Sequence, residues 1–261
     1  LDVGGTKIHG VCITASGNIQ KQIKQPTNHA KDLFYDQICS IIDALYNPRL
    51  KGIGIGVPGV VNNNSILDVP HLKCIENSSL QQKLKRKYKV PVRIDNDANC
   101  FVLGEFLFGA GKKENTVLGI TLGTGLGAGV IINKELIRGR SGEIGRVILL
   151  NQDVEKATSG PNLSNQHPKK LSAKQIVQEK DAASKKIMKK CYTYLANIIG
   201  SSASLVDFDK IIIGGSVGIA LSSKKLSESI KMVIQEPVRV SVVKQKHNHA
   251  ASLGAAALVM R

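Results

Sequence analysis

The sequence is poor in aromatic residues and contains no long apolar run. Among its 261 residues only 4% are Phe, Trp or Tyr, and Trp is absent, so few rings could stack on the bases of a single strand. Its longest apolar runs, such as residues 211–213 and 255–260, are far shorter than the ~20 residues of a transmembrane helix. We therefore expect a soluble globular protein with no membrane segment and no aromatic platform for nucleic acid.

Cysteine is also sparse, and its five positions follow no metal-binding or redox spacing. The residues are Cys12, Cys39, Cys74, Cys100 and Cys191, scattered through apolar surroundings. This pattern indicates reduced, mostly buried thiols and a cytoplasmic protein. No signal peptide is visible, but the sequence opens at Leu1 inside a strand-like run, which leaves room for an upstream segment.

Positive charge, by contrast, is abundant: 36 Lys and Arg against 20 Asp and Glu give a formal net charge of +16. Many basic clusters, such as residues 83–87, 185–186 and 189–190, fall on stretches with helical apolar spacing. We interpret them as solvated helix faces that also attract anionic metabolites. The alternative is a nucleic-acid surface, but no helix-turn-helix or zinc-finger pattern is present. We expect such a partner only if a DNA-binding domain precedes Leu1.

A cluster of polar residues stands where a predicted strand passes into a predicted helix. An apolar-alternating run over 90–94 predicts the strand, and apolar residues at helical spacing within 99–109 predict the helix. Between them lie two carboxylates and two amides, Asp95, Asn96, Asp97 and Asn99. Helix capping explains one or two such residues, but four are costly to bury without a further role. The junction is therefore a candidate site, with capping as the alternative.

Two glycine-rich turns are each predicted to join a pair of strands. The first, Gly4-Gly5-Thr6-Lys7, follows Asp2, and the second, from Gly123 to Gly129 with Thr124 in it, stands between strands over 116–122 and 130–132. Glycines let a backbone approach an anion closely, a threonine can donate a hydrogen bond, and Asp2 can hold a cation or its water. An ordinary glycine turn explains one hairpin but not Asp2. Two such hairpins in one chain imply two half-sites that grip one polyanion.

Two further segments combine glycine with polar residues. A strand over 52–59 carries Gly at alternate positions up to Gly59, which serves either tight packing or a ligand at the strand's end. The polar stretch over 60–72 is too long for a hairpin turn, and we interpret it as a binding loop. The loop over 139–146 carries Glu143 between glycines. Glu143 is either a surface carboxylate or a positioned ligand contact, and we favour the second.

Taken in order, these motifs resemble the ROK family (repressor, open reading frame, kinase) of the sugar kinase, heat-shock protein and actin superfamily. The similarity rests on Asp2-Val3-Gly4-Gly5-Thr6-Lys7, Asn96-Asp97-Ala98-Asn99, Leu122-Gly123-Thr124-Gly125-Leu126-Gly127 and Gly142-Glu143-Ile144-Gly145. Residues 211–215 resemble the family's adenosine motif, and residues 251–256 its closing helix. The resemblance covers essentially the whole chain. It implies an α/β protein with the two-domain, actin-like ATPase (ribonuclease H-like) fold and an interdomain cleft.

By this resemblance the chain would be an ATP-dependent kinase that phosphorylates the 6-hydroxyl of glucose, a related hexose or an N-acetylhexosamine. Asp97 would be the general base, and Asp2 would position Mg²⁺ through water. The glycine-rich motifs would hold ATP and its phosphates, through Gly4, Gly5, Thr6, Lys7, Gly123, Thr124, Gly125, Gly214 and Gly215. The sugar would be held by Asn96, Gly59, His71, Glu143, Arg146 and Glu155.

The sequence departs from the family pattern around Arg146. Most family kinases carry His there, followed by a cysteine-rich zinc loop, whereas here only residues 147–154 separate Arg146 from Glu155. Because Arg is permanently charged and does not bind zinc, we predict no zinc site, and the loss of the His contact leaves the sugar open. His71 lies where the family has a sugar loop, and it is either a sugar ligand or an exposed histidine.

The resemblance also predicts discontinuous domains. Residues 1–97 with 250–261 would form a smaller N-terminal α/β domain, and residues 98–249 a larger C-terminal one. The family's habit predicts a homodimer. Two other functions remain: a ROK-type transcriptional regulator that senses a sugar, and a sugar-binding relative that has lost turnover.

Overall fold

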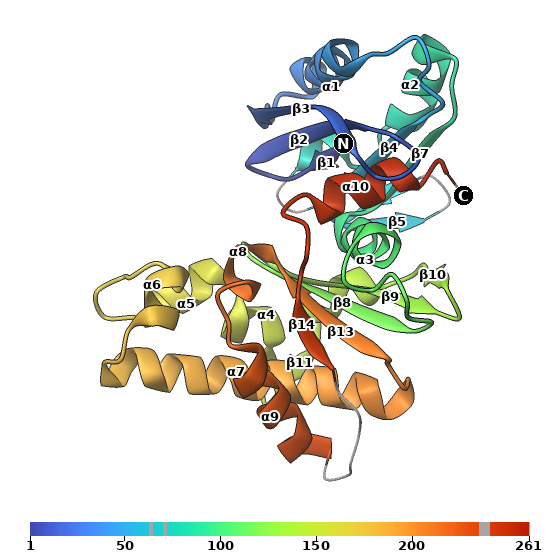
Figure 1. Cartoon of the computed structure of the whole chain (residues 1–261). Helices are drawn as coiled ribbons and strands as arrows, with labels where there is room; N and C mark the ends of the chain where they lie inside the picture. The colour runs from blue at the N-terminus through green and yellow to red at the C-terminus, as the bar shows by residue number, and fades with distance from the viewer. Residues whose placement is uncertain (63–64, 70–71, 235–240, 261) are drawn as a thin grey trace.

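Two five-stranded mixed sheets form separate lobes, with a pair of helices between them (Figure 1). The structure is a computed structural model, and it describes residues 1–62, 65–69, 72–234 and 241–260. The expected α/β architecture is confirmed. Within the described ranges, every helix is too short or too polar to span a bilayer.

The first sheet has the strand order β3-β2-β1-β4-β7. Its strands are β1 (Asp2–Val3), β2 (Lys7–Ile13), β3 (Ile19–Pro26), β4 (Ile53–Val57) and β7 (Val92–Asn96). The predicted first hairpin is confirmed, because β1 and β2 pair antiparallel with Val3 opposite Ile8, while β4 runs parallel to β1 and β7. Helices α1 (Lys31–Leu45) and α2 (Leu80–Tyr88) share one apolar core with this sheet.

The second sheet has the order β10-β9-β8-β13-β14. Its strands are β8 (Val117–Leu122), β9 (Leu126–Ile132), β10 (Glu135–Ile137), β13 (Lys210–Gly214) and β14 (Val242–Lys244). The second hairpin is confirmed, but its turn is shorter than expected, because β9 begins at Leu126, opposite Leu122, rather than at Val130. The long helix α7 (Ala182–Leu205) and α9 (Ser223–Ile234) pack beneath this sheet (Figure 1). The apolar stripe of α7 is therefore core, because Cys191, Leu195 and Ile199 are buried there.

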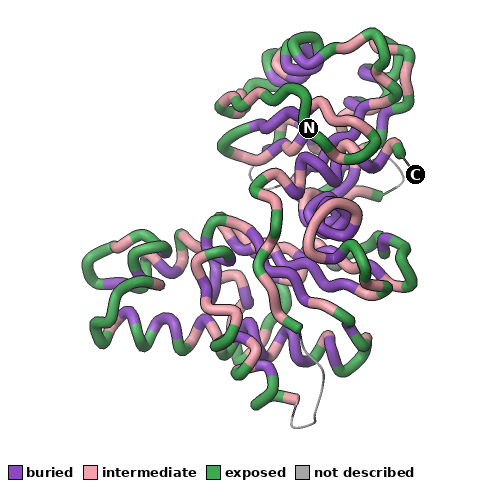
Figure 2. Tube along the Cα trace, in the orientation of Figure 1, coloured by how far each residue is buried: buried purple, intermediate pink, exposed green. Residues whose placement is uncertain are grey.

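The layer between the lobes consists of α3 (Asp97–Phe108) and α10 (Ala250–Ala257). The two helices touch through their backbones, since a Cβ at Gly104 would overlap the Ala250 carbonyl oxygen and a Cβ at Gly254 would overlap that of Cys100. Figure 2 shows both helices as mostly buried. We propose the domain division 1–97 with 250–261 and 98–249, with this helix pair at the junction.

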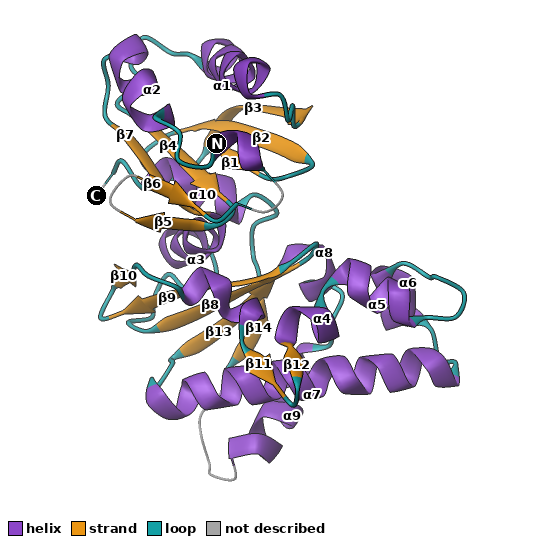
Figure 3. Ribbon diagram, turned by 180° about the vertical axis from the view of Figure 1, so that it is seen from behind, coloured by secondary structure: helices purple, strands orange, loops and turns teal. Residues whose placement is uncertain are grey.

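The remaining elements are short and gather around the two lobes (Figure 3). They are β5 (Val60–Asn62), β6 (Ser65–Leu67), η1 (Lys73–Ile75), η2 (Ser141–Arg146), β11 (Ile148–Leu149), β12 (Gln152–Asp153), α4 (Val154–Thr158), α5 (Gly160–Gln166), α6 (Ala173–Gln178) and α8 (Gly215–Gly218). The stretch expected as one irregular loop over 60–72 therefore contains an antiparallel hairpin, β5 with β6, which follows the turn at Gly59.

Candidate active site

The four polar residues at the strand-to-helix junction have distinct roles. β7 ends at Asn96 and α3 begins at Asp97. Asn96 caps the helix, because its Oδ1 accepts hydrogen bonds from the N–H groups of Ala98 (2.9 Å) and Asn99 (3.2 Å). The capping alternative therefore holds for Asn96. Asp97 does not cap the helix, and its Oδ1 accepts a hydrogen bond from the Ala98 N–H at 2.8 Å.

Asp95 and Asn99 hold the junction together. Asp95 is buried, and its Oδ1 accepts hydrogen bonds from the Asn96 N–H and from Asn99 Nδ2, each at 2.8 Å. Its Oδ2 accepts from Arg138 Nε, also at 2.8 Å. A buried carboxylate with this many donors is a stable structural element. Of the two carboxylates at the junction, Asp97 alone is left for chemistry.

Burial, together with the negative charge of Asp2, raises the pKa of Asp97 to about 7, although the hydrogen bond from the Ala98 N–H acts in the opposite direction. Burial also raises the pKa of Asp2. Neighbouring carboxylates repel each other, so a proton or a cation between them is favoured. A carboxylate whose pKa lies near neutral pH is suited to accept a proton in catalysis.

The first glycine-rich turn is held in place by β3's end. The Gly4 N–H donates to the Lys7 carbonyl at 3.0 Å, which closes the turn between β1 and β2. Thr27 follows β3, and its hydroxyl donates to the Gly4 carbonyl at 2.6 Å while its N–H donates to the Thr6 carbonyl at 3.0 Å. These bonds occupy carbonyl oxygens of the turn. The side chains of Thr6 and Lys7 are exposed.

The second glycine-rich turn contacts the starts of two helices. The Gly123 N–H donates to the Gly125 carbonyl at 3.0 Å, and the Gly160 N–H, at the start of α5, donates to the Gly123 carbonyl at 2.8 Å. A Cβ at Gly123 would lie 3.4 Å from Ser216 Oγ on α8. The predicted phosphate turn and the predicted nucleotide glycines therefore lie side by side.

Gly214 and Gly215 link β13 to α8. Gly215 has φ +82°, a left-handed conformation that favours glycine. Its N–H donates to Gln245 Oε1 at 3.0 Å. A side chain at Gly215 would also clash with the backbone of Leu122, the last residue before the second turn.

The first turn of α3 lies between the two lobes' hairpins. On one side, Asp2 pairs with Gly56 across β1 and β4, and a Cβ at Gly56 would lie 3.5 Å from the Asp97 Cα. On the other side, a Cβ at Gly127 of β9 would lie 3.0 Å from the Ala98 Cβ. The structure thus brings Asp97 together with Asp2 from the first hairpin and with the strand that follows the second turn.

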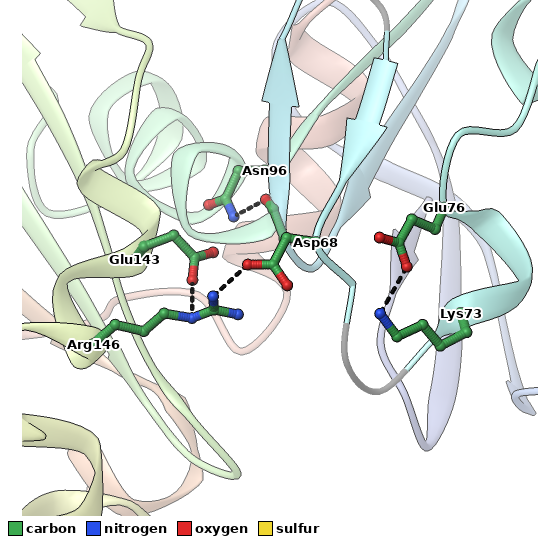
Figure 4. A network of polar contacts seen from close by, with 7 residues as sticks. Asp68, Lys73, Glu76, Asn96, Glu143 and Arg146 are labelled. Carbon is green, nitrogen blue, oxygen red and sulfur yellow. Dashed lines mark hydrogen bonds and ion pairs between the residues drawn. The ribbon is translucent and has the colours of Figure 1, made fainter.

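Glu143 and Arg146 lie on η2 and pair with each other, Nε to Oε2, at 2.8 Å. Arg146 Nη1 also donates to Asp68, which follows β6 in the other lobe (Figure 4). This hydrogen bond lowers the pKa of Asp68. Burial raises the pKa of Glu143, against the attraction of Arg146. A Cβ at Gly142 would lie 2.7 Å from the Asn96 amide, so η2 adjoins the junction.

The other expected sugar residues are placed differently. Gly59 accepts a hydrogen bond through its carbonyl from Asn96 Nδ2 at 2.9 Å (Figure 4). Glu155 lies on α4, and its Oε2 accepts from the Leu126 N–H at 2.9 Å, directly beside the second turn. His71 lies outside the described residues.

Sequence reasoning missed two residues of this region. Asp68 lies in a polar stretch, where no pattern distinguishes it. Arg138 directly precedes the loop over 139–146, which drew attention only for its glycines and Glu143. A buried Asp95 does demand a cationic partner, but the sequence gives no sign of which arginine supplies it. Both contacts are long-range, between residues 43 and 78 positions apart.

The residues fit a nucleotide bound with a divalent cation. The pKa values of Asp2 and Asp97 are both raised. A cation beside the two carboxylates would relieve their mutual repulsion, which contributes to the raised pKa of Asp97. Mg²⁺ needs only one or two carboxylates, because water and phosphate supply its other ligands. In the part of the chain that the structure describes, no three His, Cys, Asp or Glu side chains gather as a metal site. The absence of zinc stays a prediction.

Comparison with known proteins identifies relatives along the whole chain. The model of the ROK family matches residues 1–261. A glucokinase of Streptomyces coelicolor is 37% identical over 145 residues, which span 54% of this chain and 45% of that enzyme. A xylose repressor of Caldicellulosiruptor bescii is 35% identical over 157 residues, 56% of this chain and 39% of the repressor. The chain therefore spans less than half the length of these two relatives in the matched regions.

A solved structure extends the similarity to the complete fold. The ROK family glucokinase from Streptomyces griseus, in complex with glucose and AMPPNP, superposes with a TM-score of 0.84 at 26% identity, covering 98% of this chain and 97% of that one. The two-lobed fold is thus the actin-like fold that the sequence predicted. Because the family model matches every residue of the chain and the fold agrees, this chain belongs to the ROK family, within the actin-like ATPase superfamily.

Proposed function

We propose that this chain is a kinase that transfers the γ-phosphoryl group of ATP to the 6-hydroxyl of a hexose, with Asp97 as general base. One observation carries the proposal. At this junction Asn96 caps the helix and Asp95 is paired with Arg138, so Asp97, with its pKa raised to about 7, is the carboxylate available to accept a proton. Such a group is basic enough to take a hydroxyl proton, and about half of it is ionised at neutral pH.

The reaction divides between the two turns and the carboxylate. Asp97 accepts the proton of the 6-hydroxyl while O6 bonds to the γ-phosphorus, and the bond from that phosphorus to the β–γ bridging oxygen breaks to release ADP. The turns at Gly4–Lys7 and Gly123–Gly125 hold the phosphates by backbone N–H groups and exposed threonines. Asp2 would position Mg²⁺ through water, and the bound ion would supply charge neutralisation of the phosphates.

The sugar is held on the other side of Asp97. Asn96 and Glu143 supply amide and carboxylate groups that bind hydroxyls, and the carbonyl of Gly59 fixes the Asn96 amide. Glu155 supports the second turn through Leu126 and extends the acidic wall beside Glu143, whose pKa its charge raises. We keep Gly214 and Gly215 as nucleotide contacts, since they adjoin the second turn.

The direct test is ADP release with a panel of hexoses and N-acetylhexosamines, using wild type and Asp97→Asn. The amide cannot accept the proton, so we expect kcat to fall by about 10²–10⁴ while nucleotide affinity stays nearly unchanged. Asp207→Asn removes an exposed carboxylate outside the site and serves as the control. Full activity of Asp97→Asn would remove Asp97 as the base.

The pH dependence gives a second reading of the same group. Asp97 acts as its carboxylate, so kcat/KM should fall as pH falls through about 7, the pKa in the free protein. A sugar-sensing regulator is the competing function, since a repressor is among the relatives. Sugar binding without turnover for any sugar of the panel would favour the regulator over the kinase.

A further inference from the structure

The ion pairs of Arg146 connect the two lobes at the rim of the site. Glu143 and Arg146 belong to η2, which packs on β9 of the second sheet, whereas Asp68 follows β6 beside the first sheet. The guanidinium bonds to both carboxylates through different nitrogens, Nε and Nη1. Figure 4 shows the two carboxylates converging on one arginine from opposite sides of the site.

Each end of this bridge is tied to Asn96. On the Asp68 side, a Cβ at Gly59 would lie 2.8 Å from the Asp68 carbonyl oxygen, and the carbonyl of Gly59 holds the Asn96 amide at 2.9 Å. On the η2 side, Gly142 packs against that same amide. The bridge therefore completes a closed ring of contacts, and Asn96 and Glu143, which are both proposed to hold the sugar, are members of this ring.

The charges of the bridge are accessible to water. The side chains of Arg146 and Asp68 are each 50% exposed, whereas that of Glu143 is 19% exposed. Ion pairs at this exposure are weak and are screened by salt. The link between the lobes at this rim can therefore open without disturbing the core, and added salt promotes opening.

We propose that Arg146 is a positioning residue that holds Glu143 toward the sugar and latches Asp68 onto η2, so that hexose affinity depends on a salt-sensitive bridge between the lobes. The sugar part rests on the proposed function, and the latch itself does not.

Hydrogen exchange on the ligand-free protein tests the latch without any assumption about catalysis. Asp68→Asn removes the charge but keeps the size of the side chain, so we expect faster exchange in residues 65–69 and 141–147 than in wild type. Glu76→Gln is the matched control, because it breaks the Lys73–Glu76 pair at 2.8 Å within one lobe (Figure 4). Equal exchange in Asp68→Asn and wild type would overturn the latch.

Steady-state kinetics with glucose, or with the best sugar of the panel, test the effect on binding. We expect Asp68→Asn to raise the sugar KM about threefold to tenfold with kcat within about twofold, and Asp68→Glu to restore most of the affinity. Adding Asp68→Asn to Arg146→Gln should cause no further loss, since the bridge is already broken.

Hydrogen exchange and kinetics test the latch and its role in sugar binding independently. An unchanged sugar KM in Asp68→Asn, alongside faster exchange, would overturn the role in sugar binding. A wild type without turnover for any sugar would remove the proposed function, and the exchange comparison would still decide the latch.

Discussion

The two lobes meet in two places that are built in opposite ways. At the α3–α10 junction the helices touch through glycine positions, and Glu105 is fully buried with its carboxylate bonded to backbone N–H groups. At the rim, Asp68, Arg146 and Glu143 meet through partly exposed ion pairs. The first contact tolerates no displacement, whereas the second can break and re-form. We therefore expect that any movement between the lobes separates them at the rim and leaves the helix pair in contact.

The largest effect is expected at the helix pair. In Gly254→Ala the new methyl group would overlap the Cys100 carbonyl oxygen, so α10 must move away from α3 or the chain must unfold. Overpacking against backbone costs about 3 kcal/mol or more of unfolding free energy. Urea denaturation measures it. Ala256→Gly, on the same helix, should cost only about 1 kcal/mol through helix propensity. A loss below that of the control would contradict tight packing at this junction.

The second effect concerns pH and the contact between β2 and α10. His9 is only 5% exposed, its Nδ1 lies 2.7 Å from Ser252 Oγ, and its ring packs 4.6 Å from that of His249. Burial lowers the pKa of His9 to about 4. Between about pH 6.5 and 4, His9 is therefore protonated in the unfolded chain but neutral in the folded protein.

The contribution of His9 to stability is full above about pH 6.5 and should fall by up to about 3 kcal/mol as pH drops through this window. Asp97, whose pKa is raised to about 7, contributes in the opposite direction over the same window. Denaturant titrations of wild type and His9→Gln at a series of pH values isolate His9, because the glutamine keeps a polar partner for Ser252 but cannot be protonated, so the difference in unfolding free energy between the two proteins should shrink as pH falls. The same slope in wild type and variant would assign the pH dependence to another group.

The third effect tests the anchor of the segment that joins β14 to α10. Glu105 Oε1 accepts hydrogen bonds from the N–H groups of Lys246 and His247, each at 3.0 Å, and Oε2 accepts from the Ala110 N–H at 2.8 Å. Glu105→Gln has one accepting oxygen, so an amide group must face a backbone donor. We expect a loss of about 2 kcal/mol of unfolding free energy.

Thermal unfolding of Glu105→Gln beside Glu135→Gln provides the check, because Glu135 lies exposed at the edge of the second sheet. If both variants lose the same small amount, Glu105 is not an anchor. If the loss is confined to Glu105→Gln, hydrogen exchange should place the faster exchange in residues 245–249.

Much of the fold followed from local pattern. Both hairpins were predicted because glycine turns and flanking apolar runs are local signals. The helix expected over 99–109 begins earlier, at Asp97, because Asn96 rather than a later residue caps it. The resemblance supplied the fold, which no periodicity alone could give.

What sequence could not show depends on residues far apart in the chain. Asp97 and Glu143 could be proposed from motifs, but their electrostatics depend on Asp2, Arg146 and Asp68, which come together only in the fold. The buried role of Glu105 was likewise invisible, because a glutamate in a helix usually faces water. Two of its three backbone donors, the N–H groups of Lys246 and His247, lie more than 140 residues later.

The smallest stability effect is expected at the rim. Asp68→Asn removes one exposed ion pair, and pairs of this kind contribute little to folding, so Tm should shift by no more than about 2 °C. Differential scanning calorimetry at low and high salt measures it. Raising the salt concentration should shrink even this difference, because it screens the pair in wild type. A large, salt-independent drop in Tm would mean that the rim is part of the folded core, and the contrast between a fixed helix pair and a breakable latch would fail.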